Sequence, residues 1–160
     1  MTIHTPVTQA LDTLGLPYRT FTHTNPVRSL EQAAAERDQQ PAQVVRSLLF
    51  RLSAESYVMV LVAGPQQIPW PALRRHLGES RLTMASREEL LAVTGYEPGT
   101  VAPFGLRQSV RLLIDQTVLT PDEISLGSGQ RNTAVILATS DLRRALPHAE
   151  PVNLYQKQSE

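Results

Sequence analysis

The sequence contains no cysteine and only one lysine, Lys157, close to its C-terminal end. The absence of cysteine excludes disulfide bonds, thiolate zinc sites and a cysteine nucleophile. The body of the chain carries arginine but no lysine. A mechanism that needs a deprotonatable amine is therefore excluded, because the arginine guanidinium stays charged.

The sequence also lacks an excess of charge and a long hydrophobic segment. Its 15 basic and 15 acidic residues give a net charge of zero. This balance argues against a protein that coats nucleic acid through bulk electrostatics, but it allows a local patch that binds one end of an RNA. We expect no DNA partner. No apolar run approaches the roughly 20 residues that cross a bilayer. The N-terminal residues show no secretory signal, so we expect a cytoplasmic protein with no membrane partner.

The composition indicates one globular domain. Apolar residues make up 41% of the 160 positions and charged residues 19%, which is typical of a folded chain with one core. No repeat or low-complexity linker divides the sequence. We therefore predict a single domain over residues 1–160, in which residues 155–160 form a polar tail.

Helix and strand signals are interspersed along the chain. Capping residues followed by helical spacing of apolar positions predict helices over residues 6–14, 30–37, 71–77 and 87–93, and a short one from residue 140. Runs rich in apolar residues predict strands over residues 18–22, 44–52, 57–63, 110–115, 134–138 and 151–155. The second long run, residues 57–63, is apolar throughout and is expected to be central. This mixture predicts an α+β fold with a mixed, mostly antiparallel sheet.

Familiar catalytic patterns are missing from the sequence. None of the four histidines stands at metal-ligand spacing from another histidine or from a carboxylate cluster, so we expect no metal site. No Gly-x-Ser-x-Gly elbow and no Walker loop is present. Gly127-Ser128-Gly129 is only a fragment of a dinucleotide fingerprint, and a tight turn is its simplest interpretation. We expect no cofactor.

Two features remain as candidates for a site. Arg46 is a charge inside an apolar strand, and it either reaches solvent or points inward at a partner. Ser47 faces the opposite side if that strand is regular. The loop over residues 95–106 contains three glycines and two prolines, and such loops either connect elements or expose backbone N–H groups to a ligand.

These segments, taken in order, resemble the YbaK/prolyl-tRNA-synthetase-associated domain family along nearly the whole chain. The most specific part is Gly-Tyr-x-x-Gly-x-x-x-Pro-x-Gly, which starts at Gly95. The further matching segments are Leu11–Tyr18, His23, Ser29–Ala34, Gln43–Phe50, Val60–Gly64, Leu73–Gly78, Gly127–Gly129 and Ser140–Leu142.

The resemblance implies a strongly twisted, barrel-like sheet surrounded by helices. It implies an aminoacyl-tRNA deacylase that hydrolyses the ester of a mischarged tRNA carrying a small amino acid, because a synthetase pocket rejects small near-isosteres poorly. The expected partner is the acceptor end of aminoacyl-tRNA, and the resemblance leaves open an aminoacyl-tRNA synthetase as a second partner.

The resemblance also assigns residues to the site. The catalytic set is Arg46, Gly99 and Gly105. The substrate-binding set is Ser47, Tyr18, His23, Thr100, Pro103, Phe104, Gly127, Ser128 and Gly129. If Ser47 and Arg46 both line the cavity, the strand must bend there.

Arg46 stands where the family pattern has a lysine. Arginine keeps the positive charge and can hold a phosphate or a carbonyl, but it is bulkier and cannot act as a base. Two alternatives follow: a deacylase adapted to arginine, or a family member that binds aminoacyl-tRNA, an amino acid or a nucleotide without hydrolysis. The arginines at positions 74, 75, 81, 87, 143 and 144 either contact the acceptor stem or form solvated helix faces.

Overall fold

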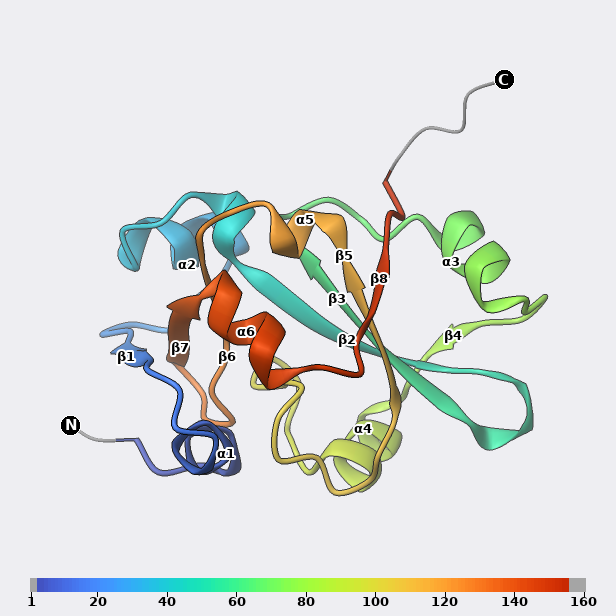
Figure 1. Ribbon diagram of the computed structural model, residues 1–160, viewed down its shortest axis with the longest axis horizontal. Helices are drawn as coiled ribbons and strands as arrows, with labels where there is room; N and C mark the ends of the chain where they lie inside the picture. The colour runs from blue at the N-terminus through green and yellow to red at the C-terminus, as the bar shows by residue number, and fades with distance from the viewer. Residues whose placement is uncertain (1–2, 156–160) are drawn as a thin grey trace.

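The computed structural model describes residues 3–155, with the side chain of residue 54 excepted. The predicted polar tail, apart from residue 155, lies outside these residues. Helices occupy α1 (Pro6–Thr13), α2 (Leu30–Glu36), α3 (Trp70–Leu77), α4 (Arg87–Thr94), α5 (Gln116–Leu119) and α6 (Thr139–Ala145). Strands are β1 (Arg19–Thr22), β2 (Val45–Arg51), β3 (Tyr57–Ala63), β4 (Thr83–Met84), β5 (Arg111–Asp115), β6 (Glu123–Gly127), β7 (Thr133–Ala138) and β8 (Glu150–Val152). Figure 1 shows their arrangement.

The strands form two sheets. The larger has the order β4-β2-β3-β5-β8, and the smaller has the order β1-β7-β6. The β3–β5 and β5–β8 pairs are parallel, whereas the other pairs between named strands are antiparallel. The predicted α+β fold with a mixed, mostly antiparallel arrangement is confirmed.

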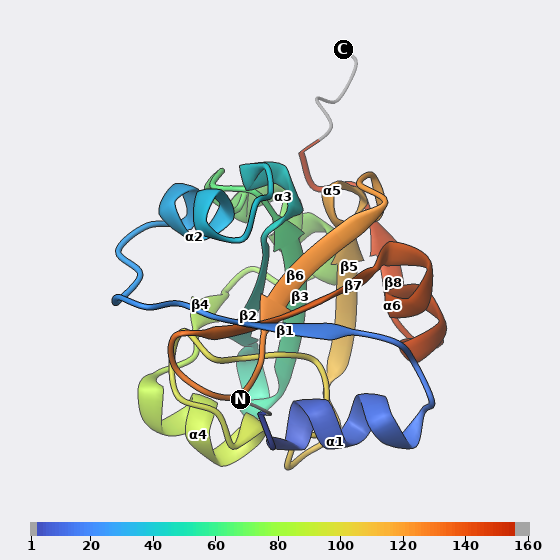
Figure 2. The same ribbon diagram turned by 90° about the vertical axis from the view of Figure 1, so that its left-hand side faces the viewer.

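The strands of the small sheet run across those of the large sheet (Figure 2). The two sheets meet where Val44, just before β2, forms an isolated parallel bridge with Ser125 of β6. The described residues thus form two sheets joined at one corner. Within the described residues a single isolated bridge connects the sheets, so the barrel-like closure that the resemblance implies stays a prediction.

The predicted central strand, β3, lies between β2 and β5. Its residues from Val58 to Val62 have no exposed surface. Successive side chains point to opposite faces of a strand, so β3 contributes side chains to two separate hydrophobic clusters. Met59 and Leu61 pack toward the small sheet, whereas Val58, Val60 and Val62 pack toward α3.

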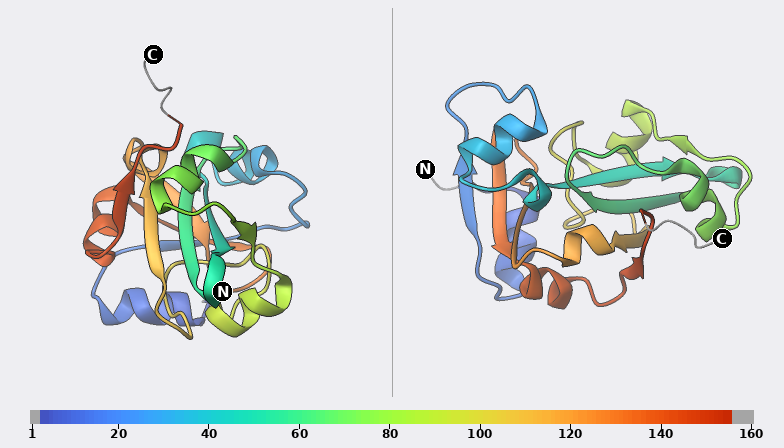
Figure 3. Two further views of the ribbon diagram at one scale, coloured as in Figure 1. Left: turned by 90° about the vertical axis from the view of Figure 1, so that its right-hand side faces the viewer. Right: turned by 90° about the horizontal axis from the view of Figure 1, so that it is seen from above.

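The helix α3 covers the face of the large sheet that points away from the small sheet (Figure 3). Phe50 of β2 is fully buried on this face, and its ring meets Trp70 edge to face with a centroid distance of 5.2 Å. Gly78 ends α3 in the left-handed conformation with φ of 68°. Glycine tolerates this backbone at no steric cost, so α3 ends where the sequence predicts.

The ends of the other helices also follow their capping residues. Ser86 and Glu89 exchange hydrogen bonds as a capping box at the start of α4. Ser29 caps α2 by accepting from the Gln32 N–H, but the Gln32 side chain accepts from the backbone of Arg28 instead of returning to Ser29. The predicted capping box at Ser29 is therefore only half formed.

Sequence patterns missed β6, α5 and β4. The strand β6 follows Pro121 and Asp122, residues typical of turns, and it pairs with β7 along its whole length. The helix α5 is a single turn capped by Asp115, whose side chain accepts from Thr117. Short elements of this kind are defined by their tertiary partners and carry little periodicity of their own.

Candidate functional site

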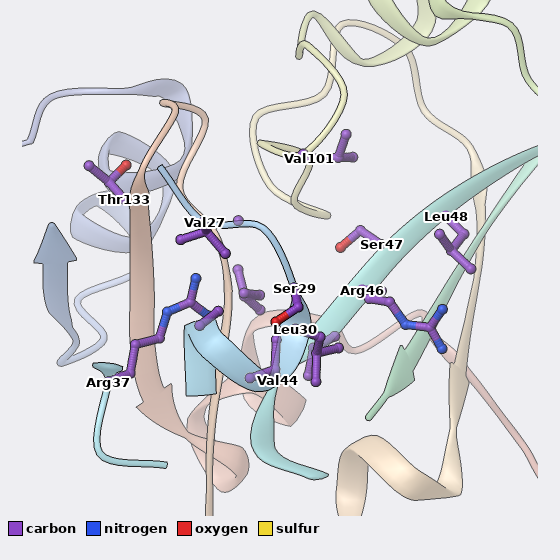
Figure 4. A pocket seen from close by; sticks show the side chains of 15 residues that line it. Val27, Ser29, Leu30, Arg37, Val44, Arg46, Ser47, Leu48, Val101 and Thr133 are labelled. Atoms are coloured by element: carbon purple, nitrogen blue, oxygen red, sulfur yellow. The ribbon is translucent and has the colours of Figure 1, made fainter. Parts of the chain in front are cut away.

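A pocket of about 390 Å³ opens at the corner where the two sheets meet. This volume lies within the range of ligand pockets, roughly 300–1,000 Å³. Its walls come from α2, β2, the loop after α4 and the β6–β7 pair (Figure 4). The lining residues are Val27, Ser29, Leu30, Ala33, Arg37, Val44, Val45, Arg46, Ser47, Leu48, Gly99, Val101, Leu126, Gly127 and Thr133.

One wall is an unpaired edge of β2. The short strand β4 pairs only with Phe50 and Arg51, so in the described part of the chain no strand pairs with this edge over residues 46–48. The carbonyl of Leu49 accepts from the Ala85 N–H on this edge. Backbone groups alternate along a strand, so Ser47, two residues earlier, directs its own N–H and C=O to the same edge. The pocket therefore borders a stretch of open main chain.

Ser47 also contributes a side chain to the pocket. Its hydroxyl oxygen is buried and has no hydrogen-bond partner among the described residues. Ser47 pairs with Leu61 in the register of β2 and β3, which puts it on the face that looks toward the small sheet. Figure 4 shows the hydroxyl directed toward the loop that carries Val101. A buried hydroxyl without a partner is costly, and a ligand in the pocket would supply one.

The guanidinium of Arg46 leaves the pocket by the other face of β2. It donates to the carbonyl oxygen of Gln66, and Figure 4 shows the head group directed away from Ser47. The register from Val45 to Arg51 is continuous, so the strand has no bend that would bring both side chains to one side. Strand alternation therefore places this guanidinium on the face of β2 away from Ser47, although Arg46 lines the same pocket as Gly99 and Gly127. The part of Arg46 before the guanidinium lines the pocket.

The two glycine-rich segments form the opposite wall, in contact with each other. A methyl group on Gly127 would lie 2.2 Å from the carbonyl oxygen of Val101. The Gly129 N–H donates to the carbonyl of Thr100 at 2.9 Å. Gly99 lies in the left-handed conformation with φ of 85° and has open space where a side chain would stand. Main chain therefore makes this wall, and only glycine permits the close approach at Gly127.

The remaining predicted residues of the loop after α4 support this wall from behind. Thr100 and Phe104 are buried, and the Thr100 hydroxyl donates to the Glu97 carbonyl at 2.8 Å. The Tyr96 hydroxyl donates to the carbonyl of Phe104, and burial raises the pKa of Tyr96 to about 12. Gly105 packs against Pro6 of α1. Pro103 lines a different cavity, beside α6.

Ser128 and Gly129 also lie behind the pocket wall. The Ser128 carbonyl accepts from the hydroxyl of Thr5 at 2.5 Å, and its buried hydroxyl contacts that of Thr133. Gly129 packs against Tyr96 and Thr5. These contacts connect the β6–β7 turn to the start of α1. Ser128 and Gly129 therefore support the position of Gly127 but do not line the pocket.

Tyr18 and His23 do not line the pocket either. The Tyr18 hydroxyl donates to Asp12 of α1 at 2.8 Å, and partial burial is the main cause of its raised pKa. The His23 side chain is fully buried, with Nδ1 at 2.8 Å from a Glu36 carboxylate oxygen and Nε2 at 3.1 Å from Arg37 Nε. The hydrogen bond from His23 lowers the pKa of Glu36.

Sequence reasoning missed Arg37, Ser29 and Thr133, which line the pocket. Arg37 ends an alanine-rich helix, where a basic residue is common and gives no functional signal. Thr133 begins β7 and is buried. The partners of Arg37 stand 14 and 88 residues away in the sequence, so no local pattern could have found its position.

The chemistry available in the pocket is limited to hydroxyls, main-chain groups and arginine. No carboxylate, imidazole or thiol belongs to the lining residues. Across residues 3–155, no group of three His, Cys, Asp or Glu side chains is arranged to hold a metal ion. The pocket is therefore suited to bind and polarise a substrate, and it offers no side chain as a strong general base.

The fold and the pocket define a class of protein, and the comparisons with known proteins identify it. The sequence profile of the aminoacyl-tRNA editing domain matches residues 24–145, which is more than half of the chain. The chain belongs to the aminoacyl-tRNA editing domain family. The resemblance to the YbaK/prolyl-tRNA-synthetase-associated domain is thus confirmed.

Individual relatives are of two kinds. The multifunctional Ser/Thr-tRNA deacylase ProXp-y of Escherichia coli is 29% identical over 138 residues, which cover 83% of this chain and 82% of that protein. The proline–tRNA ligase of Kosmotoga olearia is 37% identical over 92 residues, or 58% of this chain. The chain spans only 16% of that ligase.

Solved structures show the same fold. A candidate trans-editing enzyme for prolyl tRNA synthetase superposes with a TM-score of 0.85 at 24% identity, and the match covers 95% of this chain and 96% of the other. No helix within residues 3–155 is long and apolar enough to cross a membrane.

Proposed function

We propose that this protein is an aminoacyl-tRNA deacylase that hydrolyses the ester between a small amino acid and the 3′ end of a mischarged tRNA. The observation that carries the proposal is the pocket itself, where an open strand edge, a buried hydroxyl without a partner and a main-chain glycine wall converge. Membership of the editing family and the likeness to ProXp-y over most of both chains support it.

The proposed reaction uses water as the nucleophile. Main-chain N–H groups at Gly99 and at the β2 edge would polarise the ester carbonyl and stabilise the oxyanion. The Ser47 hydroxyl would bind the aminoacyl group. Water adds to the carbonyl carbon, the bond to the ribose oxygen breaks, and that oxygen receives a proton. The free amino acid and a tRNA with an intact terminal ribose leave.

The proton has no obvious acceptor on the protein, because the pocket lining lacks a carboxylate and an imidazole. The vicinal hydroxyl of the substrate's own terminal ribose is the nearest group of the right chemistry, so we propose that it assists the attacking water. The protein would then act mainly by positioning the ester, which by itself lowers a reaction barrier substantially. This assignment predicts that tRNA ending in a 2′-deoxyribose is bound but hydrolysed slowly.

We propose a small aminoacyl group for two reasons. Ser47, Val101 and Leu126 line the pocket, and the main chain beside Gly127 leaves no room even for a methyl group. The acceptor end of tRNA is the proposed partner, and a prolyl-tRNA synthetase is the proposed supplier, since the chain resembles part of proline–tRNA ligases. A cytoplasmic location would follow, because tRNA is charged there.

A second function is favoured by one observation. The Arg46 guanidinium is turned away from the pocket, and the lining offers no general base. A member of the family that binds aminoacyl-tRNA or an amino acid without hydrolysing it would have these features. The two functions predict the same occupant and differ only in turnover.

The test is deacylation of a panel of labelled seryl-, threonyl-, alanyl- and prolyl-tRNA by the purified protein. The proposal expects release of at least one small amino acid well above the blank rate, with prolyl-tRNA spared. Binding of uncharged tRNA and of free amino acids is measured in parallel. Binding with no release above the blank for any substrate would leave the non-catalytic function as the conclusion.

A further inference from the structure

The pocket contains a fixed positive charge that the family resemblance does not assign. Of the two arginines that line it, Arg46 sends its guanidinium to the far face of β2, whereas Arg37 sends its guanidinium toward the cavity (Figure 4). Arg37 follows α2 as its C-terminal cap residue. Its head group is held at the side of the pocket opposite the β2 edge.

Two side chains, His23 and Ser125, hold Arg37 from behind. Its Nε donates to His23 Nε2 at 3.1 Å, and its Nη1 donates to the Ser125 hydroxyl at 2.9 Å. Because His23 Nε2 accepts from Arg37, the ring proton is on Nδ1, which donates to the Glu36 carboxylate. The Ser125 hydroxyl in turn donates to the side-chain oxygen of Gln39 at 2.6 Å. This chain of contacts fixes the guanidinium in one orientation.

The guanidinium retains donors for a ligand. An arginine carries more N–H groups than these two acceptors use. Within residues 3–155, the buried side-chain nitrogen and oxygen atoms without a partner are Arg46 Nε and Ser47 Oγ, so the remaining Arg37 donors are open to the solvent of the pocket. No carboxylate of the described chain forms an ion pair with Arg37.

A partly desolvated cation that is oriented but unpaired is costly unless an anion completes it. Burial lowers the pKa of Arg37, which is the expected sign of that cost, and the nearby Glu36 carboxylate offsets only part of it. The fork of a guanidinium matches the oxygens of a phosphate. The occupant implied by the proposed function carries phosphates in its 3′-terminal nucleotides, next to the ester.

We propose that Arg37 binds a backbone phosphate of the 3′-terminal nucleotides of tRNA, and that His23 is its positioning residue. This inference rests on the proposed function and assigns the phosphate-binding cation of the same pocket. The phosphate end of the substrate lies toward α2, and the ester lies toward Ser47 and Gly99. A purely structural alternative is that Arg37 only ties α2 to β6.

The test measures how binding depends on salt. Each phosphate contact to a single strand contributes about 0.7 to the slope of log affinity against log salt concentration. Arg37→Gln keeps hydrogen-bond donors for its protein partners and removes the charge. We expect it to weaken binding of uncharged tRNA by about 10- to 100-fold at low salt and to reduce the salt slope by about 0.7. In deacylation, KM should rise while kcat changes little.

Controls separate this role from a structural one. Arg37→Lys keeps the charge without the fork, so it should retain the salt slope with an intermediate affinity. Arg111→Met removes an exposed arginine that pairs with Glu150 outside the pocket and should change neither quantity. His23→Gln should weaken binding less than Arg37→Gln and leave the slope intact. If Arg37→Gln fails to fold, Arg37→Met provides the same measurement.

Each possible outcome of these measurements supports or overturns the role proposed for Arg37. An unchanged salt slope in a folded Arg37→Gln protein overturns the inference, whatever happens to its rate. A fall in kcat with an unchanged slope also overturns it and places the guanidinium on the ester. If the wild-type protein hydrolyses nothing, the proposed function fails, and the slope measured on uncharged tRNA still decides the role of Arg37.

Discussion

The two faces of β2 differ in what covers them: one is packed against α3, and the other borders the pocket. On the face covered by α3, Phe50 is fully buried against Trp70, and Arg46 donates to a carbonyl while its Nε has no partner among the described residues. On the face that looks toward the small sheet, Ser47 has a buried hydroxyl with no partner, beside an edge without a paired strand. One strand thus supplies a packed hydrophobic face on one side and a pocket wall on the other. Stability and ligand binding should therefore respond to different substitutions, although these are neighbours in sequence.

The largest expected effect is on the packed face. Phe50→Ala removes a fully buried ring and should lower the free energy of unfolding by about 3–5 kcal/mol. The deacylation rate per folded molecule should stay the same, because Phe50 points away from the pocket. Urea denaturation followed by tryptophan fluorescence measures the first quantity, and an assay corrected for the folded fraction measures the second. A large fall in the corrected rate would show that the two faces are coupled.

The glycine wall opposite Ser47 gives the next largest effect. Gly127→Ala places a methyl group 2.2 Å from the main-chain oxygen of Val101, so the loop must shift. We expect a loss of about 3 kcal/mol, the upper end for overpacking, together with a fall in deacylation. Gly15→Ala is the matched control, because open space surrounds that glycine and the alanine would be strained only by the left-handed φ of 70°. Equal effects from both substitutions would contradict the close approach.

Ser47→Ala should change stability and activity in opposite directions. It removes an unpaired buried hydroxyl, so the protein should become more stable by about 1 kcal/mol. Deacylation should fall by at least about tenfold, because the substrate loses a hydrogen-bond partner in the pocket. Thermal unfolding and the deacylation panel measure the two. Ser109→Ala, at an exposed position, should alter neither, and a destabilised Ser47→Ala would mean that the hydroxyl has a protein partner.

Arg46 gives the smallest expected effect. Its guanidinium bonds to Gln66 at the surface of the packed face, so Arg46→Met should cost less than about 1 kcal/mol and change deacylation by less than about threefold. Arg46→Lys restores the residue type of the family pattern and should be similarly mild. A loss of more than tenfold in Arg46→Met would show that the head group swings into the pocket when substrate binds.

The alternation along β2 explains how far the sequence could lead. A regular strand predicts that Arg46 and Ser47 face opposite sides, and the continuous register confirms this. The family resemblance correctly predicted an editing domain, and it pointed to the two glycine-rich segments as parts of the site. It also implied that Arg46 and Ser47 belong to one pocket, and both residues line it. A motif records which residues occur together and not the direction of each side chain, so it could not indicate that the Arg46 guanidinium lies on the other face of β2.

Long-range contacts could not be predicted from the sequence. Arg37 occupies its position because His23 and Ser125 receive its N–H groups, and Ser125 is 88 residues away. The strand β6, which carries Ser125, has too little periodicity to be predicted. The helices were more accessible, because residues such as Ser86 and Gly78 act on their own helix and leave a local signal.

A wall built from main chain restricts how this protein can change its preference among substrates. Every residue type except proline presents the same peptide groups, so mutation cannot easily change the surface that Gly99 and Gly127 provide. New substrate ranges within this architecture must come from the side chains that line the pocket, and the proposed function expects Ser47, Val101 and Leu126 to be the main ones. Relatives with different amino acid specificity should therefore differ at these three positions and keep the two glycines.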